Sequence, residues 1–296
     1  MYIINFIRGF CMALADSVPG VSGGTVAFIL GFYDKFITSL DDLATGSMEK
    51  KKESLKFLFK IGIGWIVGFV LAVLVLGNLF ESHIYQISSL FIGFIIFAIP
   101  IIIKEEKDCL KGKYLNLIFF IIGIAVVCAI TYFNPIGSAE TSIDVSHVSL
   151  KLGIYTFLVA MIAISAMVLP GISGSTLLLI FGLYMPIINA IKEFLHFNLS
   201  YMPILIIFVL GIITGILLTI KIIKKSIENH RSAMMYLILG LMIGSIYAII
   251  EGPKTLDIPQ AALSFKTFSI IYFIIGGLVI IGMQLLKNKL EKGKQD

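Results

Sequence analysis

Residues 17–25 read Ser-Val-Pro-Gly-Val-Ser-Gly-Gly-Thr, and residues 168–176 read Val-Leu-Pro-Gly-Ile-Ser-Gly-Ser-Thr. Compared over 15 positions from each proline, the two stretches are identical at 8. Both lie inside longer apolar regions, 3–40 and 152–191. Proline removes a backbone donor and stops an incoming helix, and glycine permits a tight turn. The repeated motif therefore predicts two apolar helices that break near their middles.

The composition places these breaks in a membrane. The 296 residues are 58% hydrophobic and 14% charged, with a mean hydropathy of +1.01. Soluble domains carry about 25% charged residues, so a polytopic membrane protein is the expected class. The net charge of +5 needs no nucleic-acid partner, because basic cytoplasmic loops account for it. Although Ala13-Leu14-Ala15 resembles a cleavage site, Arg8 interrupts the apolar run before it, so we expect no cleaved signal.

Six further runs contain no Asp, Glu, Lys or Arg and are long enough to cross a bilayer. They are 61–79, 84–103, 114–133, 203–220, 232–250 and 267–286. Glycines also recur at one offset, because Gly64, Gly68 and Gly93 lie 147 positions before Gly211, Gly215 and Gly240. We interpret these glycines as helix-packing positions. The chain is therefore predicted to be two repeats, 1–143 and 144–296.

An all-α polytopic fold with inverted topology follows from the order of these segments. Each repeat holds one re-entrant broken-helix hairpin and three transmembrane helices, and an odd number of crossings inverts the second repeat. With both termini in the cytoplasm, 19 of the 23 Lys and Arg residues lie in predicted cytoplasmic stretches. This asymmetry obeys the positive-inside rule. Two full crossings in place of each hairpin would keep the same loop assignments.

Each helix break predicts an anion site. N–H groups at a new helix start lack intrahelical partners, and with the helix dipole and nearby hydroxyls they attract negative charge. Duplication in inverted halves favours transport, whereas a single motif could equally serve close packing. The candidate binding residues are Ser17, Gly20, Ser22, Gly23, Gly24, Thr25, Gly171, Ser173, Gly174, Ser175 and Thr176, with Pro19 and Pro170 as structural breaks.

Two ionisable residues precede the first motif. Arg8 and Asp16 are eight residues apart and so share one face of a helix. Arg8 could attract an anionic headgroup, and Asp16 could bind a coupling H⁺ or Na⁺. Alternatively, Arg8 extends to the interface and Asp16 caps a helix end. Met167 replaces Asp16 in the second repeat, so any ion site is asymmetric; Trp65 is interpreted as a packing or lipid-facing residue.

Catalysis and metal binding are not expected. Gly171-Ile172-Ser173-Gly174 matches a pattern of intramembrane serine proteases, but that chemistry needs a base near the serine. The four histidines lie in or beside predicted loops, and no span holds a His-Glu-x-x-His or paired-carboxylate motif. The three cysteines (Cys11, Cys109 and Cys128) fit no zinc spacing. We therefore predict no enzyme, no catalytic residue and no bound cofactor beyond a coupling cation.

The doubled motif resembles the bacterial PopT polyprenyl-phosphate transporters. The resemblance rests on residues 15–25 and 169–176 and extends over essentially the whole chain. It implies a protein of the bacterial cytoplasmic membrane that returns undecaprenyl phosphate, the lipid carrier of cell-wall synthesis, from the outer to the inner leaflet. It also implies that Ser22, Gly23, Thr25, Ser173, Gly174 and Thr176 lie at the headgroup site.

Two other functions stay open at this stage. A transporter or channel for a small soluble anion could use the same helix ends but needs a closed aqueous route. An envelope assembly factor could use the broken helices for packing alone. Moving a lipid phosphate inward carries negative charge against a membrane potential that is negative inside. The energy required is about 2.3 kcal/mol for each charge and each 100 mV. A coupled cation is therefore expected, with Asp16 as the hypothetical site.

Overall fold

The computed structural model describes residues 2–16, 21–71, 82–133, 145, 149–256 and 259–292, which are helical and contain no strand. The first half of the chain holds α1 (Tyr2–Asp16), α2 (Gly23–Ile29), α3 (Tyr33–Thr45), α4 (Met48–Leu71), α6 (Ile84–Glu105), α7 (Lys107–Leu110), η2 (Tyr114–Asn116) and α8 (Leu117–Tyr132). The second half holds α9 (Leu150–Val168), α10 (Gly174–Ile180), α11 (Tyr184–Leu195), η3 (Leu199–Tyr201), α12 (Met202–Asn229), α13 (Arg231–Glu251), η4 (Gly252–Thr255) and α14 (Ile270–Lys292).

Among the described residues, six helical segments are long and apolar enough to cross a membrane. They are Met48–Leu71, Ile84–Glu105, Tyr114–Tyr132, Leu150–Val168, Leu199–Asn229 and Arg231–Lys254. Five of these overlap spans that the sequence predicts. The sixth predicted span, 267–286, is occupied by α14, which begins three residues later at Ile270.

The first arm of the second broken region is longer than half a membrane. Helix α9 has 19 residues, which is about 28 Å at 1.5 Å per residue. The hydrocarbon core of a bilayer is about 30 Å thick, so α9 has the length of a full crossing. The return arm is bent by 108° between α10 and α11. This geometry favours an entering arm of full depth over a half-depth hairpin.

The turns that follow the two motifs have the same local structure. Gly31 and Gly182 both adopt φ of 66°, a left-handed conformation that glycine reaches without a Cβ clash. In both turns the residue after glycine donates its N–H to the carbonyl five positions earlier, at 3.1 and 2.9 Å. This is the Schellman arrangement that ends a helix. Both halves share the pattern Ile-x-Gly-x-Tyr at these turns, at residues 29–33 and 180–184. The pattern thus encodes the end of a helix in both halves.

Glycines bring helix backbones together in four pairs. Helix α1 packs along α4 and α9 along α12, while α6 packs along α14 and α8 along α13. A Cβ at Gly64 would collide with the carbonyl oxygen of Phe6, and a Cβ at Gly240 would collide with that of Phe120. The last two pairs join one half of the chain to the other. The predicted packing role of the glycines is confirmed at these positions.

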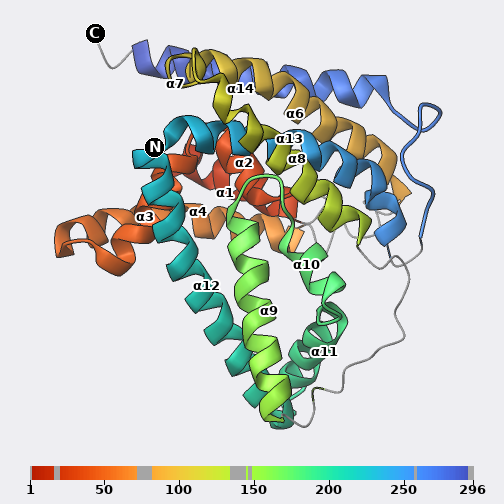
Figure 1. The fold of residues 1–296 in the computed structure, drawn as a ribbon. Helices are drawn as coiled ribbons and strands as arrows, with labels where there is room; N and C mark the ends of the chain where they lie inside the picture. Colours follow the sequence, from red (N-terminus) through yellow and green to blue (C-terminus); the bar gives the residue numbers. More distant parts are fainter. Residues whose placement is uncertain are drawn as a thin grey trace.

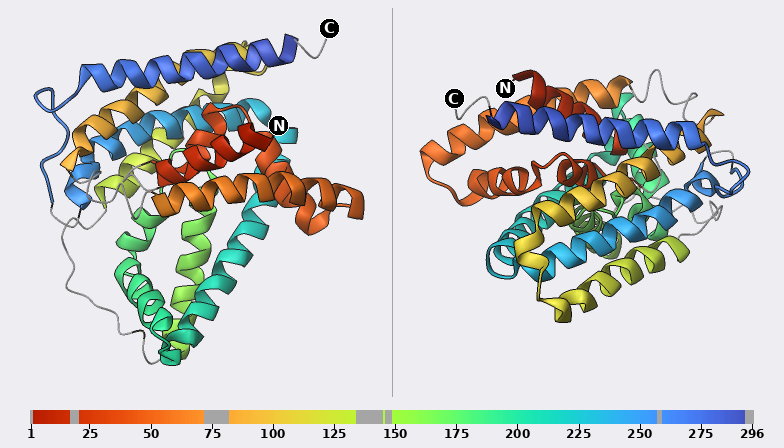
Figure 2. Two further views of the ribbon diagram at one scale, coloured as in Figure 1. Left: turned by 180° about the vertical axis from the view of Figure 1, so that it is seen from behind. Right: turned by 90° about the horizontal axis from the view of Figure 1, so that it is seen from above.

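The four pairs are arranged in two parts. Figure 1 shows α14 and α6 uppermost and α13 and α8 to one side of α1 and α4, while α9 to α12 extend away as a separate arm. The start of α1 and the end of α14 lie at the same end of the molecule in every view (Figure 2). The basic segments around α3, α7 and the α12–α13 junction lie at that end as well (Figure 1). The buried core includes Tyr33, Ile95, Met235 and Ile238, from α3, α6 and α13.

Ion pairs connect the two halves at this basic end. Arg231, at the start of α13, binds Glu106 through two nitrogens at 2.8 and 2.5 Å and reaches Asp34 at 3.0 Å. Lys224 of α12 contacts Asp41 of α3 at 2.6 Å. The Arg231 guanidinium holds the pKa of Glu106 below its ordinary value, because it donates hydrogen bonds to the ionised carboxylate. Asp34, near the start of α3, is thus part of a contact between the two halves.

Replacing Gly64 by valine should destabilise the protein, because the added side chain meets the α1 backbone. Overpacking of this kind costs about 1–3 kcal/mol, which corresponds to a fall of about 5 °C in the thermal midpoint. Gly62→Val on the same helix is the matched control, since a Cβ at Gly62 meets nothing within 4 Å. Thermal unfolding of the detergent-purified proteins measures the difference. Equal midpoints for both variants would contradict the assigned α1–α4 contact.

The Glu106 ion pair should stabilise the protein only when the carboxyl is charged. Since the folded-state pKa lies below the unfolded value, the stabilisation is complete above the ordinary pKa of 4.5 and is lost as the pH falls through the lowered one. Glu106→Gln should therefore lower the thermal midpoint at pH 7, and the difference from wild type should vanish with acidification. Midpoints measured from pH 7 to pH 3.5 test this. A constant difference over that range would mean that the charge does not matter.

Candidate functional site

The two repeated motifs meet inside the helix bundle. The Gly171 N–H donates a hydrogen bond to Thr25 Oγ1 at 2.7 Å, which joins residues 146 positions apart. The Tyr33 hydroxyl donates to the Val168 carbonyl oxygen at 3.0 Å. A Cβ added to Gly24 would lie 3.1 Å from that same oxygen. The two breaks therefore lie directly against one another.

The start of α2 is closed by the protein's own side chains. The Gly23 N–H donates to Asp16 Oδ1 at 2.6 Å, and the Gly24 N–H donates to Ser22 Oγ at 3.1 Å. Ser22 and Thr25 are 1% and 2% exposed. The expectation of unpaired N–H groups is wrong at this helix, because the Asp16 carboxylate accepts one of them and the Ser22 hydroxyl accepts the other. A ligand could approach these donors only after Asp16 withdraws.

Asp16 has a second partner that the sequence did not indicate. Its Oδ2 atom accepts a hydrogen bond from Trp65 Nε1 of α4 at 3.0 Å. The carboxylate thus satisfies both α2 and α4, which matches the capping alternative for Asp16. Trp65 was expected only to pack or to face lipid, and it does stack on Phe69 with ring centroids 5.0 Å apart. Trp65 lies between Gly64 and Gly68, which pack against α1. This position in the sequence could have indicated that Trp65 faces α1 and the residues at its end.

The start of α10 differs from that of α2. Ser173 caps the helix with its backbone, but its Oγ pairs with Ser175 Oγ at 2.8 Å and accepts no N–H. In the part of the chain that the structure describes, the N–H groups of Gly174, Ser175 and Thr176 have no hydrogen-bond acceptor. Ser175 and Thr176 are partly exposed. The N–H groups without acceptors that were expected at both motifs therefore occur at the second, among the described residues.

One substitution helps to explain why the N–H groups of the second motif lack acceptors. Met167 occupies the place of Asp16, and its side chain lies against Gly174 without offering an acceptor.

The turn of the second motif requires a glycine. Gly171 adopts φ of 95° and lies so close to α13 that a Cβ would be 2.5 Å from the Leu241 carbonyl oxygen. Helix α9 ends at Val168, two residues before Pro170, as the sequence predicts. Ser17, Pro19 and Gly20, the remaining predicted residues of the first motif, lie outside the described residues.

Arg8 supplies a positive charge on the same helix as Asp16. Its guanidinium donates to Asn5 Oδ1 at 3.2 Å and lies 4.8 Å from the centre of the Phe32 ring. The side chain is half-buried. No carboxylate among the described residues forms an ion pair with it. Arg8 thus keeps a charge that an anionic ligand can use, whereas Asp16 has hydrogen-bond partners in the protein. No group of His, Cys, Asp and Glu suited to a metal ion occurs within the described ranges.

Known proteins resemble this chain over most of its length. A family model described as "VCA0040-like: Undecaprenyl phosphate translocase-like" matches residues 12–267. A polyprenyl-phosphate transporter of Staphylococcus aureus is 35% identical over 280 residues, which cover 93% of this chain and 94% of the relative. A polyprenyl-phosphate transporter of Vibrio cholerae is 30% identical over 266 residues, or 86% of this chain and 80% of the relative. No solved structure matches.

The relatives and the apolar helices both indicate a bacterial membrane protein. Both relatives are bacterial and are named as transporters, and six segments of this chain can cross a membrane. The chain is a multi-pass bacterial membrane protein. Since the family model and both relatives cover most of its residues, it belongs to the undecaprenyl phosphate translocase-like family.

Proposed function

We propose that this protein carries a polyprenyl phosphate, with undecaprenyl phosphate as the leading substrate, from the outer to the cytoplasmic leaflet for reuse in cell-wall polymer synthesis. The names of both relatives support the substrate class. The observation that carries the proposal is the Gly171–Thr25 hydrogen bond, because it joins the two breaks in the interior of the bundle. A phosphate bound at this contact lies between the two ends of the helices. A carrier needs its binding site at such a depth, because the site must be reached from either side in turn.

The proposed architecture is a pair of inverted repeats, 1–143 and 144–296, with both termini in the cytoplasm. Its support is the matched order of helices and the matched contacts of glycines at one offset. Gly64 and Gly211, which are 147 positions apart, approach the carbonyl oxygens of Phe6 and Phe157. Gly93 and Gly240 approach those of Phe273 and Phe120. The grouping of basic segments with the chain termini at one end supports the orientation (Figures 1 and 2).

We place the phosphate headgroup first at the second motif. Two hydroxyls, Ser173 and Ser175, stand beside N–H groups that have no acceptor among the described residues. Hydrogen bonds to a charged oxygen are worth about 1.5–3 kcal/mol each. The first motif supports this headgroup site, since the Thr25 hydroxyl accepts a hydrogen bond from Gly171 and holds the second break in place. Arg8 attracts the headgroup electrostatically, and the Gly23 N–H becomes available when Asp16 leaves α2.

Cation coupling follows from this arrangement of charges. A negative Asp16 at the start of α2 repels a phosphate that approaches the joined motifs. Binding of H⁺ or Na⁺ at Asp16 would remove that repulsion and weaken its hold on the Gly23 N–H. The cation and the phosphate would then bind more strongly together than apart, which is the requirement for coupled transport.

Removing the two hydroxyls of the second motif should impair transport. In Ser173→Ala/Ser175→Ala the headgroup loses two hydrogen bonds, and we expect the rate at limiting substrate to fall by tenfold or more. Translocation of undecaprenyl phosphate in proteoliposomes measures it. The control is Thr214→Ala, which removes a hydroxyl that bonds only within α12.

The possible results separate three functions. Loss of transport only in the double variant supports the proposed headgroup site. Equal transport by all three proteins would reduce the second motif to a packing element. If wild type moves no lipid phosphate under imposed H⁺ and Na⁺ gradients but moves a soluble anion, the substrate class is wrong. An assembly factor would move neither.

Neutralising Asp16 should remove the dependence of transport on the coupling cation. Asp16→Asn keeps the size and one of the two hydrogen bonds, because its amide nitrogen cannot accept the other, and it cannot bind H⁺ or attract Na⁺. Trp65→Phe is the control, because it removes one hydrogen bond of Asp16 and leaves the charge. Rates are measured across a pH series and with and without Na⁺. A variant whose transport responds to pH and Na⁺ as wild type does would refute coupling at Asp16.

A further inference from the structure

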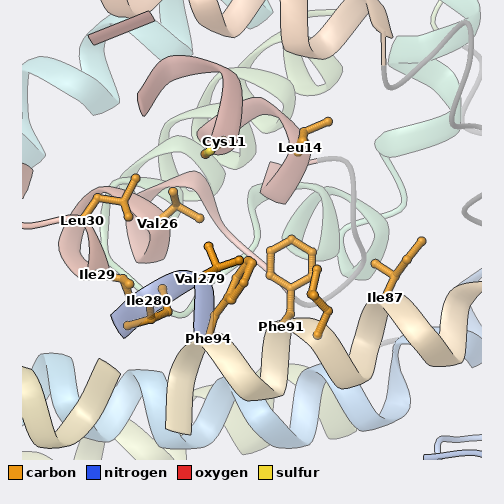
Figure 3. A pocket seen from close by; sticks show the side chains of 11 residues that line it. Cys11, Leu14, Val26, Ile29, Leu30, Ile87, Phe91, Phe94, Val279 and Ile280 are labelled. Carbon is orange, nitrogen blue, oxygen red and sulfur yellow. The ribbon is translucent and has the colours of Figure 1, made fainter. Parts of the chain in front are cut away.

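An apolar cavity lies directly beside the first motif. It has a volume of about 190 Å³ and is enclosed by α1, α2, α6 and α14, so both halves of the chain contribute to it (Figure 3). Cys11 and Leu14 enter from α1, and Val26 enters from α2. Phe91 and Phe94 of α6 point toward these side chains from the opposite wall (Figure 3).

The lining determines what the cavity can hold. Its walls are aliphatic and aromatic side chains together with the Cys11 thiol, and no charged side chain takes part. A phosphate would be bound poorly there, since an ion buried without partners is strongly unfavourable. Water is disfavoured too, because a buried water needs about three hydrogen bonds. The cavity therefore suits a hydrocarbon.

The cavity adjoins the residues that join the motifs. Val26 follows Thr25, which accepts the hydrogen bond from Gly171, and Leu14 is two residues before Asp16. A molecule with its phosphate at the motifs and its first carbons in the cavity needs to cross only about one helical turn of protein.

The opposite rim of the cavity faces lipid. Val279 of α14 lines the cavity and is 42% exposed, and its neighbour Leu278 is 61% exposed on the outer surface of the same helix. An apolar surface of this kind on a membrane helix contacts acyl chains. The remainder of a long hydrocarbon chain can therefore leave the cavity past Val279 and stay in the bilayer.

We propose that this cavity binds the isoprene unit nearest the phosphate and selects a polyprenyl chain over a straight acyl chain. This inference rests on the proposed function. A dry cavity of about 150 Å³ holds a six-carbon ring, so a cavity of about 190 Å³ accommodates a five-carbon isoprene unit with its methyl branch. A branched, flat unit fills the space between Phe91 and Val26 better than an unbranched chain does, because dispersion contacts require close fit.

Filling the rim provides a matched pair of variants. Val279→Phe places a ring in the mouth of the cavity, whereas Leu278→Phe places the same ring in the surrounding lipid. We expect Val279→Phe to weaken binding of farnesyl phosphate, a short polyprenyl phosphate, by about tenfold in detergent. Leu278→Phe should bind as wild type does. Equal affinity in the two variants would overturn the proposal.

Cys11 reports occupancy without altering the cavity. In Cys109→Ser/Cys128→Ala it is the remaining thiol of the chain, and its alkylation rate by a small maleimide can be followed. Farnesyl phosphate should slow alkylation at least fivefold, while inorganic phosphate should not. Equal protection by dodecyl phosphate, which has the same headgroup on an unbranched chain, would show a general lipid groove and overturn selectivity. Protection by inorganic phosphate, or by none of the three, would overturn the site.

These experiments separate the cavity from the proposed function. If wild type transports undecaprenyl phosphate and Val279→Phe transports it with unchanged affinity, only the tail site is wrong. If wild type neither binds nor moves any polyprenyl phosphate, the proposed function is wrong, and the tail site fails with it.

Discussion

The structure depends on how a helix can be broken inside a membrane without leaving backbone donors unpaired. Lipid offers no hydrogen bonds, so freed N–H groups must find acceptors in the protein or line a polar cavity. At the first break Asp16 supplies the acceptor, and Trp65 holds its other oxygen against α4. At the second break no carboxylate is present, and Thr25 of the first motif accepts the hydrogen bond from Gly171. The first motif thereby becomes the rigid support on which the second is built.

Near-identical motifs therefore end in different chemical states. One helix start is neutralised by an internal carboxylate, and the other keeps free donors beside two hydroxyls. The difference coincides with two substitutions at equivalent places in the two halves, Met167 for Asp16 and Ser175 for Gly24. Such asymmetry suits coupled transport, since a cation can act on one motif while the anion binds the other. A symmetric pair with two carboxylates would repel a phosphate, and a pair with none would lack a site for the cation.

Much of the fold could be predicted from local sequence, because charge-free runs, Pro-Gly breaks and Gly turns act over a few residues. The doubled motif predicted two helix breaks, but their direct contact is a tertiary feature that the structure supplies. The hydrogen bond from Gly23 at the start of α2 to Asp16 could not be predicted, since it joins two residues seven positions apart on different helices. The role of Trp65 needs a tertiary contact with α1. Glycine spacing indicated packing faces, but the pairing of α8 with α13 and α6 with α14 depends on the arrangement of both halves.

The same contacts indicate where a transport motion can occur. Within each helix pair, glycines place a helix backbone directly against its partner, so sliding would require repacking of both helices. Between pairs, the contacts include the Thr25–Gly171 and Tyr33–Val168 hydrogen bonds and the ion pairs of Arg231 and Lys224, together with buried apolar side chains such as Ile95 and Met235. Arg231 is 39% exposed in its side chain, and exposed ion pairs of this kind are worth only about 0–1 kcal/mol. The helix pairs are therefore the units that we expect to stay intact during transport, because a change within a pair must separate backbones in direct contact. A change between pairs must repack the buried side chains that they share, and the Arg231 ion pairs add little to that cost.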